Sequence, residues 1–393
     1  MKKRVPGLAI VAAIILSFLV IISKNSLPAV LPPAKVLPKE EIETVNESDL
    51  KIPPKFSLRI FAASLKGARD LELSPQGTIL VSQPQEGKVI ALPDANGDHK
   101  ADKQITVASG LSRPHGLAFY GGKLFIAEET KVSRYRWNEE TSSATLEKKL
   151  FDLPKGGRHF TRTMAFDSQG QLFVTIGSTC DVCFENHQFL AAVIVSDFEG
   201  NNPRLFAKGL RNAVFITTHP QTGELWGTEM GRDFLGDNLP PDEVNIIKEG
   251  RDYGWPLCYG NRVHDTDFDE KVYIQIVPQP PCGETEPPVY EVCAHCAPLG
   301  LQFVTTDKFP KDWQGDLLVA YHGSWNRSTP IGYKVVKINL ENGKAAGVED
   351  FITGFLTGSL VVARPVDLIF DQNGALYVSD DKGGFIFKIN YQN

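Results

Sequence analysis

The sequence predicts an all-β protein, a six-bladed β-propeller, on three observations. First, a glycine followed two residues later by Leu or Ile and then by another apolar residue recurs six times, at Gly77, Gly122, Gly170, Gly223, Gly315 and Gly374. Second, short alternating apolar segments flank most of these glycines, as antiparallel hairpins require. Third, the intervals between the glycines are 45, 48, 53, 92 and 59 residues. Most of these intervals are close to one four-stranded propeller blade, about 40–50 residues.

A solenoid is the structural alternative to a propeller. Each copy of the repeat is expected to be a hairpin, with an upstream strand such as residues 164–166 and a downstream strand such as residues 333–338. The repeat lacks the short, even period of a β-helix, so the propeller is favoured.

The first 24 residues have the composition of an export signal. Lys2, Lys3 and Arg4 precede an apolar run from Val5 to Ile22. This run is near the shortest length that spans a bilayer, and no Ala-x-Ala cleavage site follows it, so a cleaved signal peptide and an uncleaved membrane anchor both remain open. Either way the body of the protein is expected in the periplasm or outside the cell.

The remaining chain divides into a linker and a propeller. Residues 25–55 are rich in Pro, Glu and Lys, as expected of an extended linker. The propeller is expected over residues 56–393, and residues 56–62 are expected to supply the strand that closes the ring with the last blade. The interval of 92 residues predicts an insertion rather than an extra blade, because paired prolines and four cysteines lie in it.

Charge and composition exclude one class of function. The formal net charge is −6, and no Lys/Arg run lies outside the extreme N-terminus. The chain therefore lacks the basic footprint of a protein that binds nucleic acid. An apolar content of 42% with 22% charged residues is typical of a folded globular protein.

Six cysteines occur, an even number that favours disulfides in an exported chain. They are Cys180, Cys183, Cys258, Cys282, Cys293 and Cys296. Two C-x-x-C pairs leave a four-thiolate zinc site or a redox dithiol as alternatives, and the spacing does not assign the connectivity.

Polar segments precede the inner strands of the predicted blades. Five of the six carry Arg or His at equivalent places, including Arg69, His115, Arg162, Arg211 and Arg364. A converging ring of cations is a receptor for a small ligand with several negative charges. The alternative for each single Arg is that it binds backbone carbonyls of neighbouring loops.

Several motifs in order resemble those of the pyrroloquinoline quinone (PQQ) dependent glucose/sorbosone dehydrogenase family. The run Gly209-Leu-Arg-Asn212 is followed by Gly223-Glu-Leu-Trp-Gly-Thr-Glu229, by Pro241-Asp-Glu-Val-Asn-Ile-Ile247 and by Asp252-Tyr-Gly-Trp-Pro256. Residues 157–163, 177–183, 236–242 and 322–327 are more similar to the sorbosone branch than to the glucose branch. The resemblance covers about residues 56–392 and implies a six-bladed propeller.

The resemblance also implies roles for individual residues. His159 would be the general base that takes the proton from a substrate hydroxyl while hydride passes to the quinone, with Arg211 stabilising charge on the quinone oxygens. A structural His in a loop is the alternative for His159. The implied cofactor contacts are His115, Arg162, Arg211, Asn212, Arg327 and Arg364. The implied partners are a small sugar substrate and an external electron acceptor, with the membrane as a further partner if the N-terminal segment is uncleaved.

A calcium ion would polarise the quinone cofactor. The resemblance implies backbone carbonyl ligands at Gly231 and Arg232. A separate segment, Asp94-Ala-Asn-Gly-Asp-His-Lys-Ala-Asp102, has oxygen ligands at alternate positions like half of a calcium loop. It lacks a Glu at the twelfth position, so a solvated turn is an equal interpretation.

Two departures from the family pattern keep other functions open. Val214 stands where the glucose branch has a polar cofactor contact, and the cofactor-stacking residues of blade five are not recognisable in Cys293-Ala-His-Cys296. A calcium-dependent lactone hydrolase is one alternative, which would use carboxylates such as Glu229, Asp242 and Asp367 as metal ligands. A binding propeller without catalysis is the other.

Overall fold

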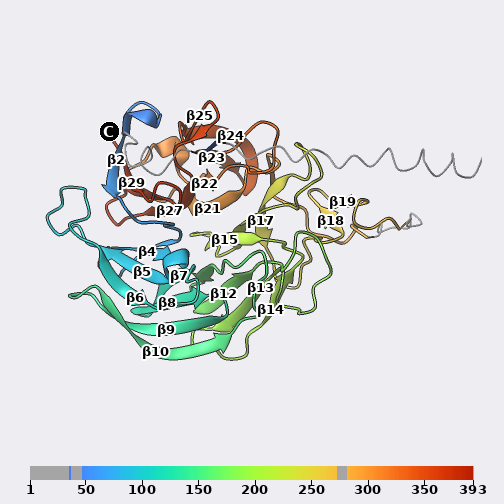
Figure 1. Ribbon diagram of the computed structural model, residues 1–393, viewed down its shortest axis with the longest axis horizontal. Coiled ribbons are helices and arrows are strands. Elements are labelled where there is room, and N and C mark those ends of the chain that lie inside the picture. Colours follow the sequence, from blue (N-terminus) through green and yellow to red (C-terminus); the bar gives the residue numbers. More distant parts are fainter. Residues whose placement is uncertain (1–34, 37–46, 272–280, 393) are drawn as a thin grey trace, which may run out of the picture.

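The chain forms six four-stranded antiparallel sheets arranged as the blades of a propeller (Figure 1). The computed structural model describes residues 35–36, 47–271 and 281–392. Each innermost strand contacts the innermost strand of the next blade, and the sixth contacts the first, so the ring is closed. The predicted fold class is confirmed. The expected signal or anchor segment, residues 1–24, lies outside the described residues.

The first three blades each use four consecutive strands. Blade one contains β3 (Leu71–Leu73), β4 (Ile79–Gln83), β5 (Lys88–Leu92) and β6 (Ile105–Ser109). Blade two contains β7 (Leu117–Tyr120), β8 (Lys123–Glu128), β9 (Lys131–Asn138) and β10 (Ser143–Asp152). Blade three contains β11 (Met164–Phe166), β12 (Gln171–Ile176), β13 (Ala192–Asp197) and β14 (Arg204–Lys208).

The last three blades depart from this order in two places. Blade four contains β15 (Ala213–Thr218), β16 (Leu225–Glu229), β17 (Asp242–Ile247) and, after an insertion, β20 (Tyr290–Val292). The insertion holds the hairpin β18 (Cys258–Tyr259) and β19 (Val263–His264). Blade five contains β21 (Pro298–Phe303), β22 (Leu317–Tyr321), β23 (Lys334–Glu341) and β24 (Lys344–Ile352). Blade six contains β27 (Pro365–Phe370), β28 (Leu376–Asp380), β29 (Ile386–Tyr391) and the N-terminal β2 (Phe56–Ala62).

Strand β2 closes the ring as the sequence predicts. It pairs antiparallel with β29, from Phe56 opposite Tyr391 to Ala62 opposite Ile386. In Figure 1 the blue N-terminal strand therefore lies beside the dark red C-terminal strand. The expected insertion is also confirmed, because the described part of the long interval adds the hairpin β18–β19 to blade four and contains no seventh sheet of four strands.

The repeated glycine follows from backbone geometry. All six repeat glycines have positive φ, from 73° at Gly122 to 92° at Gly77. This region is strained for residues with a Cβ, so glycine suits the hairpin turns. Side chains before the turn complete it, as where Asp167 Oδ1 accepts hydrogen bonds from the backbone N–H groups of Gln169 and Gln171.

The hydrophobic core is divided among the contacts between neighbouring blades. One cluster joins Leu80 and Val89 of blade one to Leu124 and Ile126 of blade two. Similar clusters of buried apolar residues lie at the other five blade contacts. Because each blade is packed on two sides, the alternating strands bury both faces, and the closure by β2 completes the sixth contact.

Residues ahead of β2 also pack against the propeller. Leu50 is buried in the cluster between blades five and six, and Lys51 forms two backbone hydrogen bonds with Thr353, each of 2.9 Å. The helix η1 (Glu47–Asp49) places the Glu47 carboxylate 2.8 Å from the backbone N–H of Ile60. Residues 47–55 of the predicted linker thus belong to the packed body. Strand β1 (Lys35–Val36) pairs with β26 (Leu360–Val361), which pairs with β25 (Leu356–Thr357).

Three disulfides connect the six cysteines, as Cys180–Cys183, Cys258–Cys282 and Cys293–Cys296. Disulfides are confirmed, and each C-x-x-C pair closes on itself, so the two pairs do not form a four-thiolate zinc site. Such bonds indicate an oxidising compartment. In the part of the chain that the structure describes, no helix has the length and apolar character needed to cross a membrane. Two short 3₁₀ helices, η2 (Pro84–Glu86) and η3 (Lys311–Trp313), complete the elements.

Candidate active site

A cleft of about 320 Å³ lies among the loops of blades three to six. Its lining residues come from the loops before the inner strands and from the loops after β16 and β22. Five of the residues predicted for the quinone site lie in it, namely His159, Arg211, Asn212, Gly231 and Arg364. A volume of this size is at the lower end of small-molecule sites, roughly 300–1,000 Å³.

A second cavity, of about 230 Å³, is lined by residues of all six inner strands. Asp70, Glu72 and Asp367 lie in its wall, and none of its lining residues is Lys, Arg or His. Burial raises the pKa of Glu72 to about 8 and that of Asp367 to about 7. Such a cavity does not suit an anionic ligand. Asp367 and Asp70 instead join the blades, because their carboxylates accept hydrogen bonds from the backbone N–H groups of Leu71 and Leu117, both of 2.7 Å.

His159 is held as a neutral imidazole on the wall of the cleft. Its Nδ1 lies 2.9 Å from Ser178 Oγ and 3.0 Å from Ser178 O. Burial, followed by the nearby Arg211 cation, lowers the pKa of His159 to about 3. The ring is therefore unprotonated at neutral pH, as a general base must be, and its Nδ1 is occupied by Ser178.

A glycine lets His159 and Asn212 approach each other. A Cβ at Gly177 would lie 2.5 Å from His159 Cβ and 2.9 Å from Asn212 Oδ1. Gly177 opens the predicted motif of residues 177–183, so its small size has a direct role in the site. The Asn212 backbone N–H donates to the Glu229 carboxylate at 3.0 Å, while Asn212 Oδ1 is buried and has no hydrogen-bond partner among the described residues.

Arg211 is fixed by two motifs that pack together. Gly209 has φ +76°, and a Cβ there would lie 2.6 Å from Gly254 N, so the first motif fits closely against residues 252–256. The Arg211 side chain is 4% exposed and donates to Asp181 O at 2.8 Å and to Asp181 Oδ1 at 2.6 Å. It also lies 3.4 Å from Asp233 Oδ2.

Arg364 is the cation of the cleft that lacks a carboxylate partner. It donates to the backbone carbonyls of His322 and Gly323, and its guanidinium lies 5.4 Å from the centroid of the Tyr333 ring. No Asp or Glu of the described residues forms an ion pair with it, and burial lowers its pKa. Asp381 partly offsets the cost of burying this charge without forming an ion pair, and a ligand carboxylate or similar anion would offset more of it.

Two predicted cofactor residues are buried beneath the cleft instead. Arg162 is fully buried and donates to the carbonyls of His159, Thr161 and Pro154, so it follows the alternative in which an Arg supports loops. His115 is also fully buried, with Nδ1 3.2 Å from Thr163 Oγ1, and burial lowers its pKa well below the usual value. Neither is among the residues that line the cleft.

Arg327 and Arg232 also direct their side chains to protein groups. Arg327 donates to the Asp237 and Ala294 carbonyls, and Arg232 forms a 2.8 Å ion pair with Asp265. The backbone at Gly231 and Arg232, in contrast, is consistent with the predicted calcium site. Gly231 lines the cleft, a Cβ there would lie 2.7 Å from Pro240, and no hydrogen bond from the described residues ends on the Gly231 or Arg232 carbonyl oxygen.

The carboxylates that a lactone hydrolase would use do not converge. Asp242 lines the cleft, Glu229 borders a separate small pocket, and Asp367 belongs to the second cavity. Both Asp242 oxygens accept backbone N–H groups, from Gly231 at 2.9 Å and Ala297 at 2.8 Å, and burial raises its pKa to about 7. These contacts do not favour a carboxylate metal centre.

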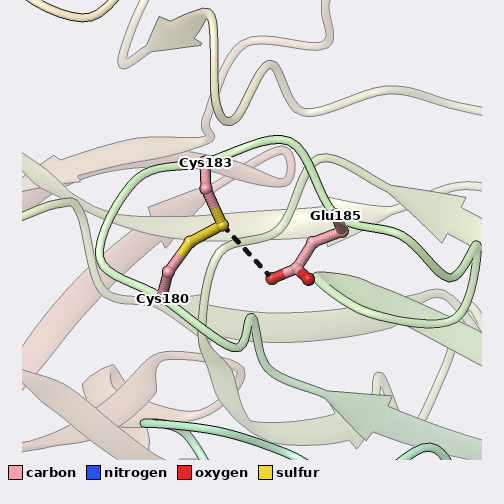
Figure 2. Close-up of side chains that lie close together, drawn as sticks. All are labelled: Cys180, Cys183 and Glu185. Carbon is pink, nitrogen blue, oxygen red and sulfur yellow. Dashed lines mark hydrogen bonds between the residues drawn. A yellow bond between two sulfur atoms is a disulfide. The ribbon is translucent and has the colours of Figure 1, made fainter.

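The closest group of metal-ligand side chains within the described residues is Cys180, Cys183 and Glu185. Figure 2 shows that the two sulfurs are bonded to each other and that Glu185 lies beside Cys183. The Glu185 Oε1 atom is 4.0 Å from Cys183 Sγ. Thiolates for a metal are therefore absent. In the loop Asp94–Asp102 the oxygens cap backbone groups, such as Asp102 Oδ2 with Ala95 N–H at 2.7 Å, which favours a solvated turn.

Several lining residues were not assigned a role from the sequence. They are Arg158, Asp233, His295, His322, Trp325 and Asn326. Asp233 accepts hydrogen bonds from Arg158 at 2.8 Å and Asn326 at 2.9 Å, and so connects three loops. His322, Trp325 and Asn326 lie in the noted motif of residues 322–327, and His295 lies in Cys293-Ala-His-Cys296. Nothing in the sequence around Asp233 distinguishes it.

The departure at Val214 does not fall in the cleft. Its side chain is buried in the cluster between blades four and five, beside Phe215 and Trp226. The Val214 side chain is therefore not part of the cleft wall. Its backbone carbonyl accepts a short hydrogen bond from Thr163 Oγ1.

Comparison with known proteins gives consistent matches over nearly the whole body. A family model described as TrAA12-like matches residues 50–392. An uncharacterised protein of Borreliella burgdorferi is 31% identical over 363 residues, covering 88% of this chain and 92% of that protein. The PQQ-dependent sugar dehydrogenase of Hypocrea jecorina is 24% identical over 390 residues, covering 84% of this chain and 87% of that enzyme.

Solved structures share the fold. The calcium structure of Trichoderma reesei Carbohydrate-Active Enzymes Family AA12 matches with a TM-score of 0.75 and 20% identity, over 94% of this chain and 100% of that chain. The holo form of the pyranose dehydrogenase PQQ domain from Coprinopsis cinerea matches with a TM-score of 0.72 and 22% identity, over 87% of this chain and 97% of that chain.

Proposed function

The chain belongs to the TrAA12-like family, and from this membership we propose that it is a quinoprotein that oxidises a sugar, with PQQ as its cofactor. Relatives whose names state this chemistry support the proposal, among them the PQQ-dependent sugar dehydrogenase of Hypocrea jecorina. The observation that carries it is the neutral His159 beside Arg211, Asn212 and an unpaired Arg364 in one cleft.

The residues present fit a planar cofactor with several carboxylates. Arg364 offers a buried guanidinium without a carboxylate partner, and Arg211 lies on the adjoining wall. The carbonyls of Gly231 and Arg232 are suited to a hard cation, which takes oxygen ligands. We assign the cofactor carboxylates to Arg364, the quinone oxygens to Arg211 and Asn212, and calcium to the two carbonyls.

When bound, PQQ would supply the electrophilic centre for one hydride, which carries both electrons, from the substrate carbon. The protein supplies the base and the orientation. Because Ser178 occupies His159 Nδ1, the proton of the substrate hydroxyl passes to Nε2. Arg211 is already fixed by Asp181 before any ligand binds, so little reorganisation is needed when negative charge develops nearby. The Trp325 ring is 43% exposed at the cleft and offers an apolar face to a sugar.

Electrons leave to an external acceptor, and the protein acts outside the cytoplasm. Three disulfides support an oxidising compartment. The N-terminal segment, as a cleaved signal or an anchor, is part of the proposal and lies outside the described residues.

The test is to load residues 47–393 with calcium and PQQ and to follow dye reduction with a panel of aldoses and with sorbosone. His159→Ala is expected to lower the turnover rate by about a hundredfold or more, because a general base typically accelerates a reaction by about 10²–10⁴-fold. His187→Ala is the matched control, since His187 is an exposed His of the same blade. Turnover that survives His159→Ala would overturn the assigned base.

A binding propeller without catalysis is the second candidate. The neutral, desolvated His159 is not needed for binding alone, and Val214 does not alter the cleft. Stoichiometric PQQ binding without turnover on any sugar would favour this candidate.

A further inference from the structure

The four-residue loop from Cys180 to Cys183 contacts Arg211 and Asp233 on one side of the cleft. Asp181, inside this loop, accepts two hydrogen bonds from the Arg211 guanidinium. Arg211 Nε donates to the Asp181 backbone O, and Arg211 Nη2 donates to Asp181 Oδ1. The same Oδ1 accepts the backbone N–H of Asp233 at 2.9 Å. Trp255 Nε1 also donates to Asp181 O at 3.2 Å.

The start of the loop connects to the candidate base. Ser178 Oγ donates to Cys180 O at 2.6 Å and lies 2.9 Å from His159 Nδ1. The Ser178 backbone N–H donates to Arg211 O at 2.7 Å. His159 and Arg211 are thus both tied to the backbone of one short loop.

The charges on this side are balanced within the protein. Arg158 and Arg211 face Asp181 and Asp233, at 2.8 Å for Arg158 to Asp233 and 2.6 Å for Arg211 to Asp181. Burial alone would raise the pKa of Asp181, but the hydrogen bond from Asp233 N–H and the two Arg cations lower it, so Asp181 is ionised. Arg211 is therefore oriented by a fixed carboxylate.

We propose that Asp181 is a positioning residue for Arg211 and that the Cys180–Cys183 disulfide keeps Asp181 in place. The two hydrogen bonds to Arg211 require the Asp181 carbonyl and carboxylate to point in the same direction. The disulfide closes the loop that keeps them in this orientation. The role assigned to Arg211 rests on the proposed function.

Reduction of the Cys180–Cys183 disulfide is expected to remove this constraint on Asp181. Both Cys180 and Cys183 are partly exposed, whereas each of the other two disulfides has at least one cysteine that is 5% exposed or less. Access of the attacking thiolate controls thiol–disulfide exchange, so this bond is expected to react first. A dithiol reductant gives two electrons and two protons, becoming a disulfide itself, and Cys180 and Cys183 become free thiols. Asp181 then loses the constraint on its backbone.

The first experiment is amide hydrogen exchange of the protein without PQQ, with and without dithiothreitol. Reduction is expected to raise exchange by about tenfold at Asp233 N–H, through the loss of its hydrogen bond to the charged Asp181 carboxylate. Exchange should also rise at Ser178 N–H, whose acceptor is the Arg211 carbonyl oxygen. The double variant Cys180→Ser/Cys183→Ser should show the raised exchange without reductant and no further change with it. Alkylation followed by mass spectrometry should find Cys180 and Cys183 labelled before the other four cysteines. Unchanged exchange in the double variant would overturn the role of the disulfide.

The second experiment separates positioning from folding. In the PQQ-loaded enzyme, Asp181→Ala is expected to lower kcat about tenfold with the KM for sugar nearly unchanged. Asp181→Asn should recover part of kcat, because its amide oxygen still accepts from Arg211 and Asp233. Asp197→Asn is the matched control, a capping carboxylate in an exposed turn of the same blade. Equal kcat in Asp181→Ala and the parent would overturn the positioning role. If the parent binds no PQQ, the proposed function fails, and the exchange experiment still decides whether the disulfide holds Asp181.

Discussion

At the scale of the residue, the site depends on which polar groups are satisfied within the protein and which are not. Arg162, Arg327 and Arg364 all donate to backbone carbonyls, but of the three only Arg364 lines the cleft. Sequence position places Arg162 and Arg364 before inner strands and Arg327 after β22, but it does not distinguish an Arg that supports a loop from one that contacts a ligand. That difference depends on the direction of each side chain.

Much of the lining of the cleft could nevertheless be predicted from the sequence. His159, Arg211, Asn212, Gly231 and Arg364 were named from motifs and come together in one cleft. Their individual roles stay predictions. Asp181 and Asp233 could not be identified from the sequence, because they act through contacts between loops that are far apart in the chain. Asp181 is 30 residues from Arg211, and Asp233 is 93 residues from Asn326.

The neutral state of His159 predicts the acid side of the pH profile. Its pKa is lowered to about 3, so lowering the pH from 7 to about 5 should not protonate the base, and kcat/KM should show no fall with an apparent pKa near 6.5. The measurement is dye reduction by the loaded enzyme across this range. A fall in kcat/KM with an apparent pKa near 6.5, as for an ordinary histidine, would contradict the buried, neutral ring.

The unpaired Arg364 predicts a loss of cofactor affinity. Arg364→Gln removes the only cleft cation of the described residues without an Asp or Glu partner, which should weaken PQQ binding by about 2 kcal/mol, or roughly thirtyfold. Fluorescence titration of PQQ into the calcium-loaded protein measures this. Arg204→Gln is the control, because Arg204 is paired with Glu249 at the surface. Equal affinity in the parent and Arg364→Gln would remove Arg364 from the cofactor site.

At the scale of the element, the ring depends on a strand from the opposite end of the chain. The alternation in residues 56–62 predicted this closure because the last blade had only three strands of its own. Phe61 of β2 packs edge-to-face on Tyr377 of β28 at 5.0 Å and is 3% exposed. What could not be predicted is that residues 47–55 also pack, since Leu50 becomes buried only through contacts with Phe355 and its neighbours.

Two shortened chains test this closure. A chain that starts at residue 47 should fold and unfold cooperatively, whereas a chain that starts at residue 63 lacks β2, exposes the edge of β29 and should aggregate. Phe61→Ala in the longer chain should lower the free energy of unfolding by about 3–5 kcal/mol. Size-exclusion chromatography and denaturant unfolding measure both effects. A stable monomer from the chain that starts at residue 63 would contradict the role of β2.

At the scale of the whole molecule, the TrAA12-like match confirms the family resemblance that the motifs predicted. The motifs succeed because several of them are pairs that pack together, as Gly209 does with residues 252–256. The sorbosone-like branch stays a prediction.

The buried carboxyls predict how stability depends on pH. Burial raises the pKa of four of them to about 7, so the folded state binds protons more tightly than the unfolded state, and the stability they contribute is lost as pH rises through 7. These groups are Asp242, Glu243, Asp367 and Asp380. Burial lowers the pKa of His115, His159 and His322, which costs stability as pH falls below about 6.5. The Tm should therefore be higher at pH 6 than at pH 8, which thermal unfolding in buffers of equal ionic strength measures; a higher Tm at pH 8 would contradict this balance.

The central claim is that the cleft among blades three to six holds the quinone cofactor. The most direct measurement is a crystal structure of the protein with calcium and PQQ. The account predicts PQQ between His159 and Arg364, with a cofactor carboxylate on the Arg364 guanidinium and calcium at the Gly231 carbonyl. PQQ in the cavity that contains Asp70 and Asp367, or no bound PQQ at saturating concentration, would contradict it.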